Sequence, residues 1–370
     1  MAVATVAVMS QPFRMLRASP LHTSATWNDG AVDIESVREA AVRQGRRVTR
    51  GIEDMPGYLA TQVADESHRA VLGPLLPASG ASGVVVHRGW VIAQWGDPTV
   101  PEMLFSATKS VVSMVAGITF DQGLLDVRAP VAATIDLAVF ATASGRGITW
   151  AHLLQQTSQW DGELWGKPTR VDAQSQREGT EAKGGAPGSG WAYNDVRVNL
   201  LCQALTALLR QPLPVVLHER LLDPLGASSS WSWQGYSNAV TDIDGDQVSV
   251  VSGGAHWGGG LWMSANDLAL LGELYRCRGR WDGRSLLSEE WIQRSWEPCQ
   301  VMPDYGYLWW LNDARRIFPA APASGRCARG NGGRHLLWVD PDRDLVIASH
   351  WGDQVEELLT EVSAAVPATT

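Results

Sequence analysis

The sequence predicts an α+β protein in which helices flank an antiparallel sheet and an all-helical subdomain is inserted into the chain. Two hairpin patterns support this fold class, because β-branched runs joined by a short turn predict adjacent antiparallel strands. They lie far apart, at residues 83–95 and 336–350, with helix-like segments between them. Strands grouped at the two ends, rather than alternating strictly with helices, favour an antiparallel sheet covered by helices.

The predicted parts follow the chain in a simple order. Residues 1–80 form an N-terminal wrapping segment without evident chemistry. Residues 81–125 and 251–370 form the sheet domain, and residues 126–250 form the helical subdomain. No repeat or clear interdomain linker separates them, so we expect one composite domain.

A buried helix is predicted at the centre of the sheet domain. Residues 105–120 (FSATKSVVSMVAGITF) are apolar nearly all round at helical length, which is typical of a helix inside the core. A polar, glycine-rich loop is expected at 167–190. Further helices are expected at residues 34–44, 60–72, 150–156, 195–210, 264–277 and 288–296, and in the C-terminal VEELLTEVSAAV.

Composition narrows the class of protein. A chain of 370 residues that is 45% hydrophobic buries a large core. Its net charge of −9 and pI near 5.4 argue against nucleic acid as a partner. No stretch reaches the roughly 18 apolar residues of a spanning helix, and no basic region precedes the short apolar run at the N-terminus. We therefore expect a cytoplasmic protein that binds no membrane. The cysteines form no CxxC or Cys/His cluster, so no metal site is expected: Cys202, Cys277, Cys299 and Cys327.

Ser106 and Lys109 lie one helical turn apart in the predicted buried helix. Residues i and i+3 share a helix face, so the hydroxyl and the amine meet at one spot. Chance produces Ser-x-x-Lys often, and a lysine on a surface helix snorkels to solvent. This chain has only three lysines, however, and burial of an unpaired ammonium costs several kcal/mol. Because burial also favours the neutral amine, the pattern predicts a serine nucleophile and its activating base.

A second candidate group is Tyr193, in the segment WAYND between the glycine-rich loop and a helix. A tyrosine at such a junction can project its hydroxyl into a cleft, where a nearby ammonium would stabilise the phenolate as a second base. The same segment also fits a packing tyrosine followed by Asn194 or Asp195 as the helix cap. Both interpretations remain open at this stage.

The third candidate segment, residues 329–334 (RGNGGR), runs directly into a strand. Glycines at a strand edge let a ligand approach the backbone, and exposed edge N–H groups can bind a developing oxyanion. A plain glycine-rich turn is the competing interpretation. A phosphate loop is excluded, because no Gly-Lys-Ser/Thr follows and the next element is a strand.

The chain is rich in tryptophan, with 18 residues. Most are expected to serve packing, but a tryptophan-lined cleft would suit apolar or aromatic substrate groups. Six lie in segments that we expect to border the site: Trp160, Trp165, Trp191, Trp257, Trp309 and Trp310.

In this order, the three segments resemble the motifs of the class C β-lactamase-like serine hydrolases, which include penicillin-binding peptidases, esterases and 6-aminohexanoate-dimer hydrolases. FSATKS is similar to the family's nucleophile segment, and residues 258–271 (GGGLWMSANDLALL) are similar to its Gly-Gly-x-x-(Ser/Thr)-x-x-Asp-Leu-Ala segment. Residues 281–291, 305–311 and 332–348 are also similar, so the resemblance covers about residues 80–355 and implies a β-lactamase/transpeptidase-like fold.

The resemblance implies acyl-enzyme chemistry without metal or cofactor. Ser106 would attack a carbonyl, while Lys109 and Tyr193 share the base and acid roles. Backbone N–H groups at the nucleophile and the edge strand would form the oxyanion hole, which we expect at Ser106, Gly332, Gly333 and Arg334. Substrate contacts are expected from Asp195, Asn194, Asn331, Trp191, Trp160 and Trp309.

Two positions depart from the family pattern. The third residue of Tyr-x-Asn is Asp195, and neither Gly330-Asn331-Gly332 nor Asn331-Gly332-Gly333 supplies the Lys or His that usually precedes the last motif's glycine. A carboxylate at position 195 repels an acidic substrate and attracts an amine. We therefore expect a hydrolase of small carboxylic esters or amides rather than a β-lactamase or D-Ala peptidase. The alternatives are an amide-forming acyltransferase with an amine acceptor and a catalytically silent binding member of the fold.

Overall fold

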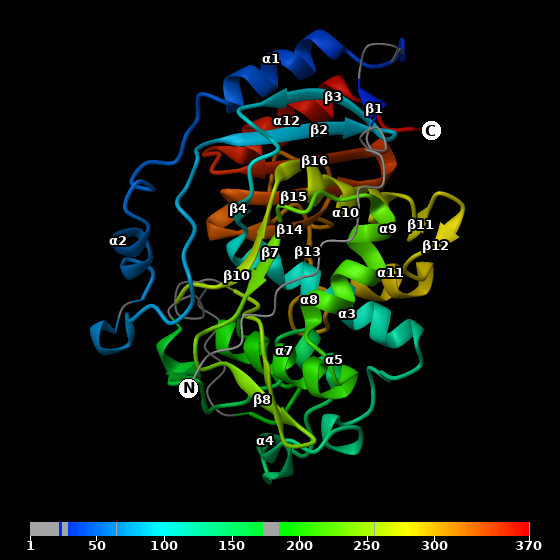
Figure 1. Cartoon of the computed structure of the whole chain (residues 1–370). Helices are drawn as coiled ribbons and strands as arrows, with labels where there is room; N and C mark the ends of the chain where they lie inside the picture. The colour runs from blue at the N-terminus through cyan, green and yellow to red at the C-terminus, as the bar shows by residue number, and fades with distance from the viewer. Residues whose placement is uncertain (1–21, 24–28, 64, 173–184, 255, 370) are drawn as a thin grey trace, which may run out of the picture.

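The computed structural model describes residues 22–23, 29–63, 65–172, 185–254 and 256–369 (Figure 1). Its main sheet has seven strands in the order β1-β3-β2-β16-β15-β14-β13. All neighbours in this sheet are antiparallel except β1 and β3. The strands are β1 (His22–Thr23), β2 (Ser82–His87), β3 (Trp90–Trp95), β13 (Trp310–Leu311), β14 (Arg326–Gly330), β15 (His335–Asp340) and β16 (Leu345–His350).

Both predicted hairpins are present and lie side by side in the sheet. Strand β2 pairs with β16 from His87↔Leu345 to Ser82↔His350, which joins the first hairpin to the second. Arg88 and Gly89, at the first turn, have φ of 50° and 81°, the left-handed values that match a two-residue hairpin turn to the twist of its strands. The two ends of the chain therefore build one continuous sheet.

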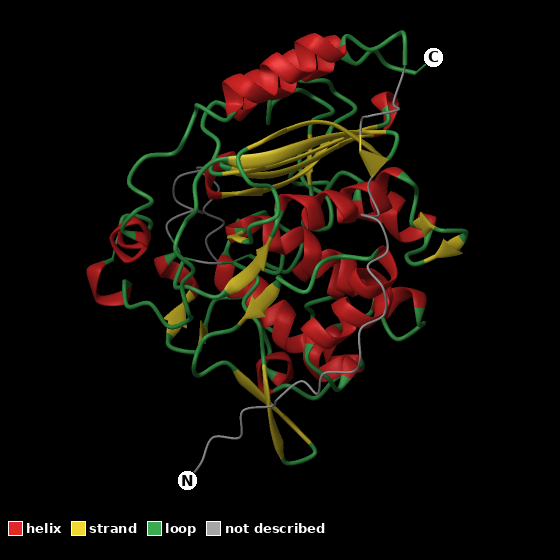
Figure 2. Ribbon diagram, turned by 45° about the horizontal axis from the view of Figure 1, so that its top comes forward, coloured by secondary structure: helices red, strands yellow, loops and turns green. Residues whose placement is uncertain are grey.

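Helices cover both faces of this sheet (Figure 2). Helices α1 (Ile34–Gln44) and α12 (Val355–Ala365) pack together on one side, and α10 (Ala265–Arg276) packs against β2, β15 and β16 on the other. All residues of β2, β15 and β16 are buried, as expected of strands covered on both faces. The prediction of an α+β fold is confirmed.

The region 126–250 is not all-helical as predicted. It holds α4 (Ala138–Ala141), α5 (Trp150–Leu154), α7 (Asp195–Leu209), α8 (Leu213–Leu217), a π-helical turn (His218–Leu222) and α9 (Asp223–Leu225). It also contains strand β7 (Ser232–Gln234) and the hairpins β5–β6 (Glu163–Leu164, Lys167–Pro168) and β8–β9 (Val240–Ile243, Asp246–Ser249). The turn of the second hairpin is Asp244-Gly245 with φ of 57° and 91°, a local hairpin signal in the sequence.

The N-terminal helix prediction at 60–72 is also wrong. A helix, α2, runs from Met55 to Ala60 and a short 3₁₀ turn from Glu66 to His68. Asp54 caps α2 by accepting a hydrogen bond from the Gly57 N–H, which explains the earlier start. Thr61 ends α2, and Asp65 accepts a hydrogen bond from Ser67 N–H at the start of the 3₁₀ turn, so the two elements stay separate.

A smaller sheet leads into the central helix. Its strands lie in the order β4 (Glu102–Met103), β10 (Gly260–Met263) and β7. After β4 comes a 3₁₀ turn (Phe105–Ala107) and then helix α3 (Thr108–Asp121), whose residues from Thr108 to Thr119 are all buried. The remaining elements are hairpin β11–β12 (Arg280–Trp281, Arg284–Ser285), helix α11 (Glu289–Ser295) and short 3₁₀ turns.

Within the described ranges, no single helix is both long and apolar enough to cross a membrane. Residues Asp195–Leu209 and Leu213–Leu225 meet that criterion only as a pair bent by 74°.

Candidate active site

Ser106 lies in a constrained turn at the start of the buried helix α3. Phe105, immediately before it, has a φ of 50°, in the left-handed region that aromatic residues rarely adopt. Strand β10 fixes the turn from the side: Leu261 accepts a hydrogen bond from Leu104 N–H and donates its own N–H to Thr108 Oγ1. The positive end of the helix dipole therefore lies at the Ser106 hydroxyl, where it favours developing negative charge.

The predicted nucleophile and base are in direct contact. Lys109 Nζ lies 2.9 Å from Ser106 Oγ and donates a hydrogen bond to it. Lys109 is 1% exposed and Ser106 is 8% exposed, so the contact is nearly dry. The same nitrogen lies 2.5 Å from Asp195 Oδ1. The lysine is therefore held between the serine hydroxyl and a carboxylate, an arrangement that aims its nitrogen lone pair or proton at Oγ.

Tyr193 joins the same cluster. Its ring centroid lies 4.9 Å from Lys109 Nζ, and its ring stacks on Trp310 with centroids 5.5 Å apart and planes at 29°. The tyrosine is 3% exposed. The structure thus brings Ser106, Lys109 and Tyr193 together, as expected from the sequence.

The two residues after Tyr193 have different places. Asn194 caps helix α7, with its Oδ1 accepting from Arg197 N–H and its Nδ2 donating to the Thr169 carbonyl. Both polar atoms of this amide form hydrogen bonds with the backbone. Asn194 therefore serves as a helix cap, whereas the sequence predicted a substrate contact. Asp195, the first residue of α7, is fully buried and faces Lys109.

Strand β14 approaches the nucleophile through Gly330. A Cβ atom on Gly330 would lie 2.2 Å from the Leu104 carbonyl oxygen and 3.1 Å from Ala107 N, so only glycine fits this approach. Strand β13 pairs with β14 only at Cys327 and Arg326, and the last three residues of β14 continue beyond it. The closest approach of β14 to the nucleophile turn is therefore at Gly330, which precedes Gly332 and Gly333 in the chain.

The turn after β14 is engaged in its own contacts. The Arg334 N–H donates to the Asn331 carbonyl and its guanidinium pairs with Asp353, 2.9 Å away. Asn331 Oδ1 accepts a hydrogen bond from Tyr58 of helix α2, and Gly333 lies nearest to Val355, Phe318 and Arg329. Arg334 N–H is thus occupied within the turn rather than directed at Ser106.

A cation does occupy the last motif, contrary to expectation. Arg329, immediately before Gly330, places its guanidinium 5.1 Å from the Trp310 ring and 5.2 Å from the Phe318 ring. Trp310 stacks in turn on Tyr193, so the arginine belongs to the same aromatic cluster. An arginine thus stands directly before the glycine, where the family usually has Lys or His.

The tryptophans divide between the cluster and the core. Trp191 lies with its ring 6.0 Å from Tyr193 and 5.9 Å from Trp310. Trp309, predicted to contact substrate, is fully buried against Tyr275, with ring centroids 4.6 Å apart. Neighbouring residues in extended chain point to opposite faces, so Trp310 rather than Trp309 reaches Tyr193. Trp160 is buried in the core, and its carbonyl accepts from Arg197 Nε.

Two further residues of the site carried no predicted role. His256 Nε2 lies 3.2 Å from Asp195 Oδ2 and 3.9 Å from Asp172 Oδ1. Asp172 Oδ2 accepts a hydrogen bond from the Asp195 N–H. His256 and Asp172 are far apart in the sequence, and neither belongs to a recognisable motif. The sequence therefore gives no indication that they meet.

His335 lies behind the nucleophile turn rather than in the site. Its ring is fully buried, 5.1 Å from the Phe105 ring, with Nδ1 3.2 Å from Nδ1 of His350. Burial lowers the pKa of both imidazoles, that of His350 to about 4. This pair therefore packs in its neutral form.

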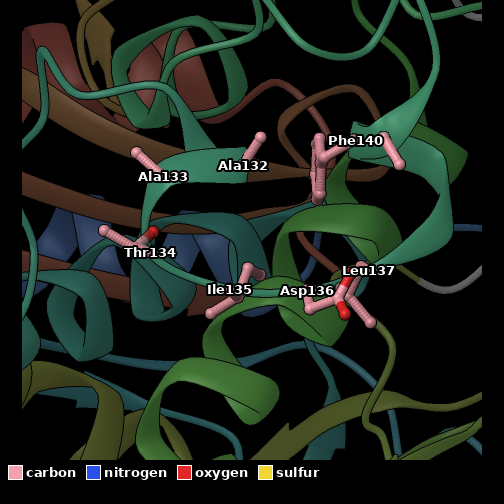
Figure 3. A pocket seen from close by; sticks show the side chains of 8 residues that line it. Ala132, Ala133, Thr134, Ile135, Asp136, Leu137 and Phe140 are labelled. Atoms are coloured by element: carbon pink, nitrogen blue, oxygen red, sulfur yellow. The ribbon is translucent and has the colours of Figure 1, made fainter.

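A separate pocket of about 340 Å³ opens at residues 132–141 (Figure 3). Asp136 is its one charged lining residue, and no residue of the Ser106 cluster lines it. In the described part of the chain, no group of three or more His, Cys, Asp or Glu side chains is arranged to hold a metal ion.

Comparisons with known proteins agree with this fold. A beta-lactamase family model matches residues 70–355. A penicillin-binding protein homologue from Caulobacter crescentus superposes with a TM-score of 0.57 at 17% identity, covering 86% of this chain and 98% of that one. A putative 6-aminohexanoate-dimer hydrolase from Bacillus anthracis superposes with a TM-score of 0.55 at 16% identity, covering 76% and 77%.

A third similar structure is EstCE1, described as a hydrolase with promiscuous acyltransferase activity, with a TM-score of 0.54 and 17% identity over 90% of this chain and 97% of that one. The fold and the family model together define a protein of the beta-lactamase fold, a family whose members are typically serine hydrolases. This chain belongs to the beta-lactamase family.

Proposed function

We propose that this protein is a serine hydrolase that forms an acyl-enzyme on Ser106 and cleaves small carboxylic esters or amides. The observation that carries this proposal is the 2.9 Å contact between Lys109 Nζ and Ser106 Oγ inside a buried helix. A hydroxyl becomes a nucleophile when a base within hydrogen-bond reach takes its proton. Lys109 is within that reach.

The proposed reaction has two halves. Ser106 Oγ bonds to the substrate carbonyl carbon as its proton passes to Lys109 or Tyr193, and the carbonyl oxygen becomes an oxyanion. The oxyanion collapses, the bond to the alcohol or amine breaks, and the leaving group takes the proton. Water then attacks the ester on Ser106 and loses a proton to the same base. The bond between the acyl carbon and Ser106 Oγ breaks, Oγ takes that proton, and the carboxylic acid is released. Backbone N–H groups at Ser106 and at the end of β14 are suited to stabilise both oxyanions.

Acyl transfer to an amine is the second candidate. It uses the same acyl-enzyme, with an amine replacing water in the second half. One observation favours it: the side chains of Trp191, Tyr193 and Trp310 are buried together beside Lys109, and such an apolar surface disfavours water as the acceptor.

Covalent labelling tests the proposal directly. We expect a fluorophosphonate to add one adduct to the wild-type protein, detected by intact mass, and none to Ser106→Ala. Ser113→Ala is the matched control, because Ser113 is equally buried two turns further along α3. An adduct that persists in Ser106→Ala would disprove the assigned nucleophile. Product ratios with a primary amine competing against water separate hydrolysis from acyl transfer.

A further inference from the structure

Tyr58, in the N-terminal segment for which the sequence predicts no chemistry, contacts both turns that border the nucleophile. Its ring meets the Phe105 ring edge to face, with centroids 6.5 Å apart and planes at 72°. Its hydroxyl donates a hydrogen bond of 2.7 Å to Asn331 Oδ1. Phe105 immediately precedes Ser106, and Asn331 immediately follows Gly330 at the end of β14. One side chain therefore joins the nucleophile turn to the turn after β14.

Both residues that Tyr58 contacts have an unusual backbone conformation. Phe105 and Asn331 have φ of 50° and 52°, in the left-handed region. For a bulky aromatic residue this conformation is an outlier, and asparagine adopts it only somewhat more readily. Such conformations persist where the surrounding structure holds them. Because Tyr58 contacts each of the two residues, it is placed to stabilise both.

The backbone segments next to these residues approach each other closely. A Cβ atom on Gly330 would lie 2.2 Å from the Leu104 carbonyl oxygen and 3.1 Å from Ala107 N, so β14 passes directly against the turn that carries Ser106. Backbone N–H groups of these two segments are the proposed donors to the oxyanion. Such donors are effective only when their positions are fixed before the charge develops. The spacing between the two segments therefore matters for the rate.

The packing around Tyr58 fixes its own position. Leu59, the next residue of helix α2, is buried in a cluster with Phe105 and Trp351. The Trp351 ring lies edge-on to Tyr58 and to Phe105, with centroids 5.9 Å and 5.4 Å away, and its Nε1 donates to Glu102 Oε2 at 2.8 Å. Burial also raises the pKa of Tyr58, so its hydroxyl keeps the proton that it donates.

We propose that Tyr58 is a positioning residue that ties the nucleophile turn to the turn after β14 and so fixes the spacing of the N–H groups that bind the oxyanion. Its ring holds Phe105 and its hydroxyl holds Asn331. It acts through the backbone of these two residues rather than by contact with the substrate. This inference rests on the proposed acyl-enzyme function, and it gives the N-terminal segment a part in catalysis.

The variant Tyr58→Phe tests the hydroxyl while it retains the ring. In aryl ester hydrolysis, kcat should fall by about tenfold, the effect of losing one hydrogen bond that supports only the transition state. KM should stay within about twofold of the wild-type value, because an oxyanion hole stabilises the transition state rather than the bound substrate. Tyr307→Phe is the matched control: it removes the same hydroxyl from a buried tyrosine whose ring lies 5.6 Å from Trp291, and kcat should not change.

The variant Asn331→Gly tests the route by which Tyr58 acts. Glycine adopts the left-handed conformation of this position without strain, and it lacks the acceptor for the tyrosine hydroxyl. Its kcat should fall by at least the same factor as that of Tyr58→Phe. In the Asn331→Gly background, Tyr58→Phe should cause no further fall, because two residues that act through one contact are not additive.

Two results would overturn the inference: a kcat in Tyr58→Phe within about twofold of the wild-type value, or losses in the two single variants that multiply in the double variant. Fluorophosphonate labelling keeps either result separate from the proposed function. The labelling rate of Ser106 should fall together with kcat in Tyr58→Phe, because the phosphoryl oxygen uses the same oxyanion hole. If Tyr58→Phe is labelled at the wild-type rate, only the role of Tyr58 fails. If Ser106→Ala is still labelled, the acyl-enzyme itself fails.

Discussion

Lys109 Nζ bridges Ser106 Oγ and Asp195 Oδ1, at 2.9 Å and 2.5 Å. The residue that replaces the amide of the family's Tyr-x-Asn motif is thus in direct contact with the lysine that we propose as the base. A carboxylate at this position stabilises the ammonium, whereas an amide does not. Asp195 therefore holds Lys109 Nζ in place beside Ser106 Oγ.

The substitution Asp195→Asn tests this relationship. Loss of the carboxylate removes the group that pairs with Lys109 Nζ at 2.5 Å and aims it at Oγ. Because a misplacement of about 1 Å in a catalytic site costs on the order of 10²-fold, kcat should fall by about that factor. Steady-state hydrolysis of an aryl ester at pH 7.5 measures the fall.

Asp282→Asn is the control for this substitution, because Asp282 lies in the exposed β11–β12 turn. An unchanged kcat in Asp195→Asn, with the fold intact by circular dichroism, would show that Asp195 does not position Lys109.

Strand β14 packs so tightly against the nucleophile turn that a single methyl group added at Gly330 should lower the activity strongly. In Gly330→Ala, the new Cβ would meet the Leu104 carbonyl at 2.2 Å, which forces β14 away from Ser106. A displacement of about 1 Å in a catalytic site lowers kcat by on the order of 10²-fold. We expect that loss in ester hydrolysis, together with a lower Tm.

Gly147→Ala is the matched control, since a Cβ at Gly147 would meet no atom within 4 Å. Equal activities of the two alanine variants would contradict the proposed role of the β14 approach.

Much of this architecture could be predicted from local patterns. The Arg88-Gly89 turn and the β-branched runs around it predict a hairpin, and the apolar run after Phe105 predicts a buried helix. Both elements are present. These features depend on neighbours along the chain. The Asp244-Gly245 turn is an equally local hairpin signal, although the whole region 126–250 is predicted to be helical.

The contacts between distant segments could not be predicted in this way. His256 and Asp172 meet Asp195 only after three loops fold together, and no periodicity encodes that meeting. Burial alone does not mark a lysine of this chain as catalytic. Lys167 is 3% exposed and donates hydrogen bonds to the His68 and Ala70 carbonyls, with no role in the Ser106 cluster.

The buried His335–His350 pair predicts a pH-dependent stability. Burial lowers the folded-state pKa of His350 to about 4, below the unfolded value near 6.5. The unfolded state therefore binds more protons between these values, so this contribution is complete above pH 6.5 and is lost as the pH falls toward 4. His350 alone accounts for about 3 kcal/mol of the free energy of unfolding over that range.

Urea unfolding at pH 7.5, 6, 5 and 4.5 measures this dependence. His350→Gln should be less stable at pH 7.5 but lose less stability on acidification than the wild type. The exposed-site variant His218→Gln should follow the wild-type curve. Parallel curves for wild type and His350→Gln would assign the acid sensitivity to other groups.

Arg329 predicts a preference for substrates that carry a carboxylate. No carboxylate in the described residues pairs with its guanidinium, which lies on Trp310 within the aromatic cluster around Tyr193. A hydrogen-bonded contact with a charged group contributes about 1.5–3 kcal/mol, so Arg329→Gln should raise KM about tenfold or more for an aryl succinate half-ester. For the neutral aryl butyrate, KM should change less than about twofold. Arg280→Gln, on the exposed β11 strand, is the matched control. Equal changes in KM for both esters would mean that Arg329 serves packing alone, whereas a selective change would show that this cation offsets the repulsion expected from Asp195.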